Sequence, residues 1–473
     1  MFKTKKQKGL FTILVGVVLW FLPMVTGLPN GLTMDAWHMF AIFVATIVGY
    51  ILTPMPIGAI ALIAVGLTGF LKVLKPAAAL SGFGNGTIWL IVSAFLFAKG
   101  FIKTGLGARI AYMIMKAIAT NSLKLGYTMA FTDFIISPAT PSNTARGGGI
   151  VFPILRSLCS AFQSEPEEGT QKKIGSYLIA STFQANCITS SIFITAVAPN
   201  LLVVSLASET AGVSIGWGQW ALAMIVPGLL ALLICPLLVY KIFPPEMKAT
   251  PDAPKIAAEK LQEMGSMKGN EKVVLFAFIL ALALWATSSF TGINATMTAL
   301  VCVGVMLIGG AIEWEDVITE KGAWNTLVWM GGLMSLATGL NKSGFIKWFA
   351  DGVGSNLDGV SWVTALLVLA LVNMYLHYAF ASMSAHVGAV YAAFLTVAIA
   401  AGAPPLLAAL MLGCETGIMG GLTHYATGSA PIFFGANYVT QAEWWKVGFI
   451  VSISNMICFV GIGMLWWKVI GLW

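Results

Sequence analysis

Long apolar runs separated by short polar gaps dominate the 473-residue chain. A helix needs about 20 predominantly apolar residues to cross the hydrocarbon core of a bilayer. By that measure the pattern predicts eleven membrane-spanning helices, near residues 10–28, 36–53, 57–74, 86–102, 175–197, 219–243, 273–292, 295–311, 324–341, 405–427 and 445–470. The expected fold is an all-α polytopic membrane protein.

Two further apolar regions, 124–162 and 361–400, are each interrupted by a polar segment near the middle. The interruptions run from Ser137 to Gly149 and from Ser382 to His386. Each half is short for a full crossing, and non-helical backbone is not tolerated where it faces lipid. We therefore predict two re-entrant helical hairpins whose tips lie in protein or in a water-filled cavity.

The two halves of the chain resemble each other. At an offset of 240 residues Ser142 to Ala145 aligns with Ser382 to Ala385, and at 232 residues Thr195 to Pro199 aligns with Thr427 to Pro431. A repeat of five spans and one hairpin has an odd number of crossings, so the second repeat is upside down relative to the first. Inverted-topology repeats are typical of secondary transporters.

The polar gap from Pro244 to Lys272 separates the two repeats. The predicted division of the chain is an N-terminal membrane helix within 1–30, a first repeat over 31–243, a cytoplasmic linker over 244–272 and a second repeat over 273–473.

Charge supports this topology. Only 10% of the residues are charged, against about 25% in soluble domains. With the N-terminus inside, 20 of the 26 Lys and Arg lie on the inner side and 5 on the outer side, while Arg146 lies in the first hairpin tip. This distribution predicts a multi-pass protein of the cell membrane with a cytoplasmic N-terminus. Because the cations lie in short gaps and form no basic face, we expect no nucleic-acid partner.

The first hairpin tip contains the residues most suggestive of a site. Ser142, Asn143 and Thr144 offer hydroxyls and an amide, and Arg146 adds a cation beside three glycines at the start of the next helix. Helix-start N–H groups with a guanidinium form an anion site. The alternative is a turn whose polar groups satisfy one another, but a charge at membrane depth is costly without a function.

The second tip is the counterpart of the first in the repeat. Ser382, Met383 and Ser384 occupy the matching positions, and His386 aligns with Arg146. A lone His in an apolar run is often a hydrogen-bonded core residue, but the alignment favours a site residue.

Two helix breaks carry further candidates. Thr195 and Pro199 mark the first break, and Thr427, Gly428 and Pro431 the second. We expect unwound helices whose freed backbone groups face the cavity between the tips, with a simple proline kink as the alternative. Weaker candidates, which could equally pack helices together, are Asn186, Thr189, Ser190, Thr423 and His424.

Three segments, SNTARGGGIVFPI, ASMSAHVGA and THYATGSAPIFFGANYV, resemble the divalent anion/sodium symporter family over essentially the whole chain. The similarity is closest to the citrate/succinate and tartrate/succinate antiporters and the plastid 2-oxoglutarate/malate translocators. The resemblance implies a homodimer, with a scaffold domain and a transport domain that moves like an elevator. It also implies di- or tricarboxylate substrates held between two Ser-Asn-Thr tips.

This chain departs from the family pattern at the second tip, where Met383 replaces Asn and Ser384 replaces Thr. Loss of the amide removes a ligand for Na⁺, and a nearby cation would repel it. We therefore expect a Na⁺-independent dicarboxylate exchanger of the 2-oxoglutarate/malate/succinate type, in which Arg146 and a protonated His386 supply the positive charge.

The alternative function is a Na⁺-coupled di- or tricarboxylate symporter, in which Na⁺ would be the bound ion. An intramembrane hydrolase using Ser142 or Ser384 with His386 or His424 is disfavoured, because an enzyme has no need of a symmetric duplication. We expect no cofactor and no metal site. The sequence does not choose among succinate, malate, 2-oxoglutarate, citrate and sulfate.

Overall fold

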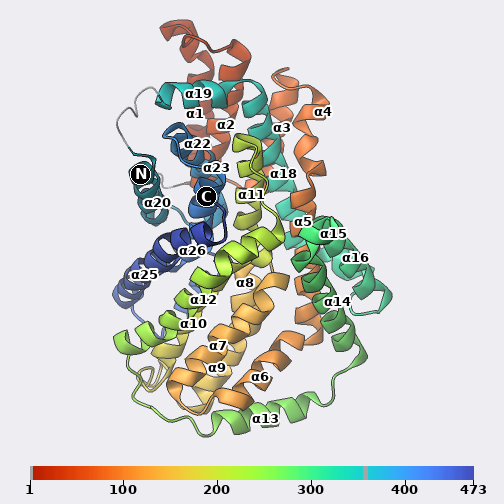
Figure 1. Cartoon of the computed structure of the whole chain (residues 1–473), viewed down its shortest axis with the longest axis vertical. Coiled ribbons are helices and arrows are strands. Elements are labelled where there is room, and N and C mark those ends of the chain that lie inside the picture. The colour runs from red at the N-terminus through yellow and green to blue at the C-terminus, as the bar shows by residue number, and fades with distance from the viewer. Residues whose placement is uncertain (1–3, 355–360) are drawn as a thin grey trace.

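The computed structural model describes residues 4–354 and 361–473, and regular structure in these residues is helical apart from one isolated bridge between Asn121 and Ala249 (Figure 1). Residues 1–3 and 355–360 belong to the predicted segments 1–30 and 273–473 and lie outside the described residues. The expectation of an all-α fold is confirmed.

The first half of the chain begins with the helices α1 (Lys5–Thr26), α2 (Met34–Leu52), α3 (Ile57–Phe70) and α4 (Pro76–Ala79), followed by the 3₁₀ turn η1 (Ser81–Gly84). The next elements are α5 (Gly86–Thr104), α6 (Leu106–Ile118), α7 (Ser122–Ile136), η2 (Ser137–Ala139), α8 (Asn143–Arg146), the π turn η3 (Gly147–Val151) and α9 (Phe152–Ala161). The half ends with α10 (Gly175–Ile192), η4 (Ile194–Ala196), α11 (Ala198–Ala211) and α12 (Trp217–Ile242).

The linker contributes α13 (Ala253–Met264). The second half continues with α14 (Gly269–Ala286), α15 (Ser288–Thr291), α16 (Ala295–Ile308), α17 (Trp314–Thr319), α18 (Lys321–Lys342) and α19 (Phe345–Gly354). Its hairpin region comprises α20 (Trp362–Leu376), η5 (His377–Ala379), α21 (Met383–His386), the π turn η6 (Val387–Tyr391) and α22 (Ala392–Ala400). The last elements are α23 (Pro405–Ile418), η7 (Met419–Gly421), α24 (Ala430–Phe434), α25 (Gln441–Met456), the π turn η8 (Ile457–Ile462) and α26 (Gly463–Val469).

Eight helices of the described chain are long and apolar enough to cross a membrane. Six of them correspond to predicted runs, and the other two are the limbs of the second hairpin, so five of the eleven predicted runs fall short of this standard. The predicted run 175–197 is among those that fall short, because it contains the polar helix α10. Every residue of α10 is buried in protein. A helix that never contacts lipid can keep polar side chains, so α10 is suited to a binding or packing role that lipid-facing helices cannot fill.

The two hairpin regions share one local geometry. The elements η2, α8 and η3 recur as η5, α21 and η6 at a constant offset of 240 residues. Each tip therefore consists of a 3₁₀ turn, a break, one α-helical turn and a π turn that continues into a longer helix. The recurrence supports the internal repeat. The limbs of the second hairpin, Trp362–Ala379 and Met383–Ala400, each reach 18 residues, longer than the pattern of apolar runs predicts.

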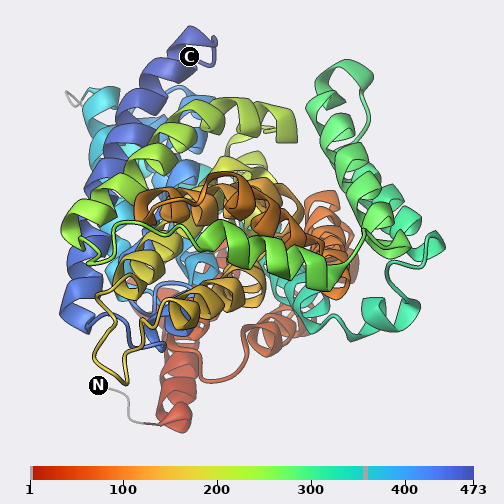
Figure 2. The same cartoon turned by 90° about the horizontal axis from the view of Figure 1, so that it is seen from below.

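The linker packs on the molecule as an ordered helix. In Figures 1 and 2 α13 runs beneath α6, against which it packs. An ion pair fastens this corner. Arg109 on α6 donates from Nε to Glu271 Oε2 at 2.5 Å and from Nη1 to the carbonyl oxygen of Gly265 at 2.9 Å. The Arg109 and Glu271 side chains are only 8% and 4% exposed, so Arg109 is a buried structural cation and not a surface group.

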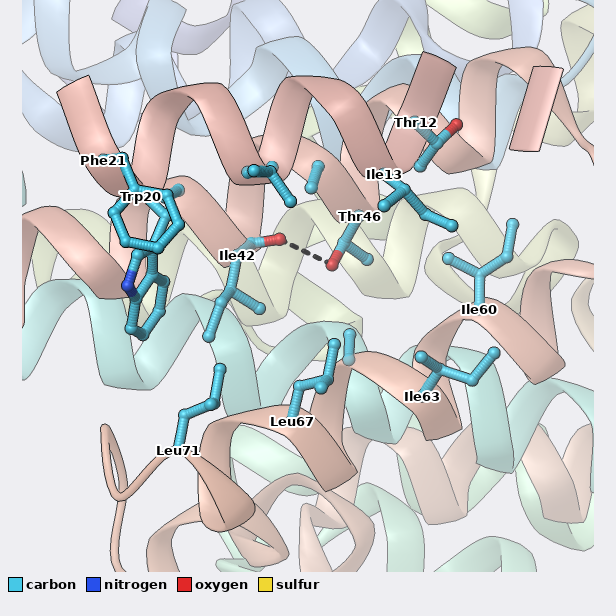
Figure 3. Close-up of a pocket in the computed structure, with 15 residues that line it drawn as sticks. Thr12, Ile13, Trp20, Phe21, Ile42, Thr46, Ile60, Ile63, Leu67 and Leu71 are labelled. Atoms are coloured by element: carbon cyan, nitrogen blue, oxygen red, sulfur yellow. Dashed lines mark hydrogen bonds between the residues drawn. The ribbon is translucent and has the colours of Figure 1, made fainter. Parts of the chain in front are cut away.

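An apolar cavity of about 400 Å³ lies among α1, α2 and α3 (Figure 3). Its two threonine hydroxyls donate to their own helices, Thr12 to the carbonyl of Lys8 and Thr46 to that of Ile42. The described lining is thus largely apolar, as on helices facing lipid, and contains no charged side chain that would bind an anion.

Replacing Glu271 by Gln tests the corner between α6 and the linker. Arg109 would keep its burial and lose its counter-charge, which should lower the free energy of unfolding by about 3 kcal/mol. Thermal unfolding of the purified protein in detergent measures the change. Asp252→Asn, in the exposed pair with Lys255, is the control and should change stability by less than about 1 kcal/mol. Equal effects of the two substitutions would contradict a structural role for the buried pair.

Candidate functional site

The two hairpin tips meet at one cavity of about 320 Å³. Nine of the sequence-predicted residues line it: Ser142, Asn143, Thr144, Ser382, Met383, Ser384, Pro199, Thr427 and Gly428. The other lining residues were not predicted as site residues, and they are Ile57, Phe95, Pro141, Val197, Ala198, Thr326, Trp329 and Ala381. The structure therefore brings both tips and both helix breaks to a common place.

Each tip serine begins a helix. Ser142 Oγ accepts a hydrogen bond from the N–H of Ala145 at 3.2 Å, and Ser382 Oγ accepts one from the N–H of Ala385 at 3.3 Å. α8 continues without interruption through η3 into α9, and α21 through η6 into α22. Two helices thus start at the cavity, and their first N–H groups carry partial positive charge.

Asn143 ties the first tip to the second helix break. Its amide Nδ2 donates to Thr427 Oγ1 at 2.8 Å and to Ser429 Oγ at 3.3 Å. Gly428, also in the second break, packs closely against Thr144 of the first tip. A Cβ placed at residue 428 would be 2.4 Å from Thr144 Oγ1. The first tip therefore fits against the second break only because residue 428 has no side chain.

Arg146 does not line the cavity, although the sequence suggested it as an anion ligand. The side chain is fully buried and pairs with Asp133, Nε to Oδ2 at 2.9 Å. Its other N–H groups donate to backbone carbonyls and hydroxyls, namely those of Thr140, Ala196, Asn186, Thr189 and Ser190. All five guanidinium N–H groups have protein acceptors and the charge has a counter-charge, so this geometry makes Arg146 a brace for the tip.

Asp133 is the ion-pair partner of Arg146, a pairing that the sequence analysis did not predict. It accepts hydrogen bonds from Asn186 Nδ2 at 2.9 Å and from the hydroxyl of Thr189, besides its bond with Arg146. The signal was a lone carboxylate in an apolar hairpin limb, thirteen residues before a lone cation. The weaker candidates Asn186, Thr189 and Ser190 belong to this buried network and not to the cavity lining.

His386 also lies behind the cavity. Its Nδ1 is 2.9 Å from Nδ1 of His377, whose Nε2 is 2.9 Å from the carbonyl oxygen of Ala426. A carbonyl only accepts, so His377 carries its proton on Nε2 and accepts from His386 Nδ1–H. Nε2 of His386 is buried and has no partner in the described chain, so this site favours the neutral ring and not the protonated ring that the sequence suggested.

The remaining candidates lie in packing positions outside the lining. Thr195 donates to the carbonyl of Pro138 at 2.6 Å and accepts from Trp217 Nε1. His424 accepts from Trp445 Nε1 at 3.1 Å. Thr423 is fully buried and Pro431 lies in α24.

The lining has a definite chemical character. None of the described residues that form it has a charged side chain, and its polar residues are serines and threonines, Asn143 and Trp329, beside backbone N–H groups at helix starts. Such a set can hold a small anion by hydrogen bonds. Neither His386 nor His424 reaches the cavity, so the serines there have no histidine base.

The chain matches known proteins over nearly its full length. A family described as the sodium:sulfate symporter transmembrane region matches residues 3–473. The putative malate transporter YflS of Bacillus subtilis is 51% identical over 98% of this chain and 96% of its own length. Dicarboxylate transporter 1, chloroplastic, of Spinacia oleracea is 47% identical over 98% of this chain and 81% of its own.

A solved structure, the YdaH transporter of Alcanivorax borkumensis, covers 98% of both chains with a TM-score of 0.58 at 13% identity, which supports the fold alone. The family match and the close relatives confirm the resemblance noted in the tips. This chain belongs to the sodium:sulfate symporter family and is a multi-pass membrane transporter, not an enzyme.

Proposed function

We propose that the protein exchanges dicarboxylates such as malate, 2-oxoglutarate and succinate across the cell membrane without Na⁺. The observation that carries the proposal is the meeting of two helix starts and their hydroxyls at one small cavity without charged side chains. The names of the relatives, a putative malate transporter and a dicarboxylate transporter, support the same class of substrate.

Two helix starts suit a substrate with two carboxylates. α8 and α21 reach the cavity from different hairpins, so each can supply backbone N–H groups to one end of the molecule. Ser142, Thr144 and Ser384 add hydroxyl donors beside these N–H groups. A monocarboxylate would leave one set of donors unpaired, which costs free energy in a site shielded from water.

Independence from Na⁺ is supported by Met383. Where the first tip has the amide of Asn143, the second has a thioether, and Na⁺ prefers oxygen ligands to sulfur. Fixed positive charge contributes less to Na⁺ independence than the sequence suggests, because Asp133 offsets Arg146 and the bonding of His386 favours its neutral form.

Exchange follows from the state of the empty cavity. Its N–H and hydroxyl donors would have to cross the membrane unpaired, whereas a bound dicarboxylate satisfies them. The loaded protein should therefore cross faster than the empty one. The proposed movement is that of a transport domain carrying both tips past a fixed scaffold in a homodimer, with the N-terminus in the cytoplasm.

Proteoliposomes test the transport mode directly. Uptake of labelled malate should require an internal dicarboxylate and should be unchanged when K⁺ replaces Na⁺. Empty vesicles and vesicles loaded with a monocarboxylate serve as controls. Uptake that needs Na⁺ and ignores the internal substrate would instead establish Na⁺-coupled symport.

Gly428→Ala tests the fit between the first tip and the second break. The new methyl group would displace Thr144, and overpacking of 1–3 kcal/mol should lower the exchange rate about tenfold. Gly149→Ala is the matched control, since a Cβ there meets nothing within 4 Å. If both variants exchange at the wild-type rate, the close approach has no functional role.

Two substitutions, made singly and together, distinguish a structural role of Arg146 from direct binding of the substrate. Arg146→Met alone leaves Asp133 buried without a counter-charge, and should lower the free energy of unfolding by about 3 kcal/mol. Adding Asp133→Asn removes the unpaired charge, and should restore much of the stability and part of the exchange rate. Thermal unfolding and malate counterflow measure the two quantities. A double variant that folds but has lost malate binding altogether would identify Arg146 as a direct ligand.

A further inference from the structure

A single carboxyl group lies buried between the second hairpin and the helix behind it. Glu415, on α23, is fully buried, and its Oε2 accepts from Asn373 Nδ2 at 2.7 Å. Its Oε1 has no hydrogen-bond partner in the described part of the chain, and no described Lys, Arg or His pairs with it. A buried carboxylate without a counter-charge costs several kcal/mol, so this surrounding opposes the ionised form.

The corresponding carboxyl group in the first half of the molecule, that of Asp133, has a counter-charge. Asn373 lies 240 residues after Asp133, at the same place in the repeat. Arg146 pairs with Asp133, and two further donors complete its hydrogen bonding. In the second half the hairpin limb has the neutral amide, and the acid lies on the neighbouring helix without a base. The balanced pair of one half is thus replaced by an isolated acid in the other.

The other ionisable groups near α23 do not compensate Glu415. The charged side chains on the helices packed against α23 are Glu209, Lys241 and Lys468, all at least partly exposed and none paired with it. Its uncharged titratable neighbours on these elements and on α23 itself are Tyr177, Cys187, Cys235, Tyr240, Tyr375, Tyr391, Cys414 and Cys458. His377 and His386 bond to each other, and His377 also to the carbonyl of Ala426.

We propose that Glu415 is a proton-binding site of the transporter. Asn373 Nδ2 also faces the carbonyl of Leu412, at 3.5 Å, which orients its N–H groups toward Oε2 and leaves the proton to Oε1. The neutral acid lets α20 pack on α23, and its ionisation opposes that packing. Na⁺ suits the site poorly, because it needs several oxygen ligands and Asn373 presents N–H groups.

The location gives the proton a consequence for transport. α20 leads through η5 to Ser382 at the second tip, so the packing of α20 on α23 positions one wall of the substrate cavity. Loss of the proton should therefore slow dicarboxylate exchange. This step rests on the proposed function, whereas the presence of the proton does not.

Infrared difference spectroscopy tests the proton itself. The wild type, compared with Glu415→Gln at neutral pH, should show the C=O stretch of a buried protonated carboxylic acid that the variant lacks. The exposed Glu315→Gln is the control and should keep the band. A wild-type protein without such a band overturns the proposal whatever the transport mode. Failure of Glu415→Gln to fold would also overturn it, because a neutral side chain of the same shape should be tolerated.

Transport provides the second measurement. The pH on both sides of the vesicle is raised together from about 6 to about 9, a range in which buried glutamic acids titrate. Exchange by the wild type should fall severalfold, and exchange by Glu415→Gln should fall much less. Identical pH profiles would exclude Glu415 as the group responsible. If uptake is Na⁺-coupled but the infrared band is present, the transport mode fails and the proton site stands.

Discussion

The buried ion pair between Asp133 and Arg146 is the interaction on which the candidate site depends. It joins α7 to the first tip, and its remaining hydrogen bonds reach α10 and the break at η4. Two opposite charges can be kept out of water only when each is fully satisfied. That requirement fixes the tip to within hydrogen-bond distance of three other elements, so the serine, asparagine and threonine at its end can be aimed at the cavity.

Burial of polar helices is the second constraint. α10 carries a glutamine, an asparagine and several hydroxyl side chains. It can do so inside a membrane protein because all of its residues are buried in protein. The apolar helices around it, such as α1 with many exposed large side chains, take the contact with lipid. The division between a polar interior and an apolar exterior allows an uncharged hydrogen-bonding cavity to exist at this depth.

The sequence predicted the features that depend on local pattern. The two tips, the two breaks and the repeat all have short polar signatures in apolar surroundings, and nine predicted residues line the cavity. It did not predict what depends on contacts across the chain. The wall formed by Thr326 and Trp329 has no local signature, since those side chains are ordinary members of their helices. Asp133 stands out as a lone carboxylate in an apolar limb, but its pairing with Arg146 is seen only in the structure. The charge of Arg146 drew attention to the first hairpin, whose tip does line the cavity. Only the structure showed that the guanidinium of Arg146 is paired with Asp133 and does not face the cavity.

The bond between Asn143 and Thr427 joins residues 284 positions apart. At synthesis rates of about 5–20 residues per second, Asn143 is made roughly 15–60 s before its partner. During that interval the amide of Asn143 lacks the hydroxyl of Thr427 as its hydrogen-bond acceptor. Lipid hydrocarbon has no acceptor that could replace it. The tip of the first hairpin must therefore stay in contact with water or with other protein during this interval. The cavity is completed only when the last helices have been inserted.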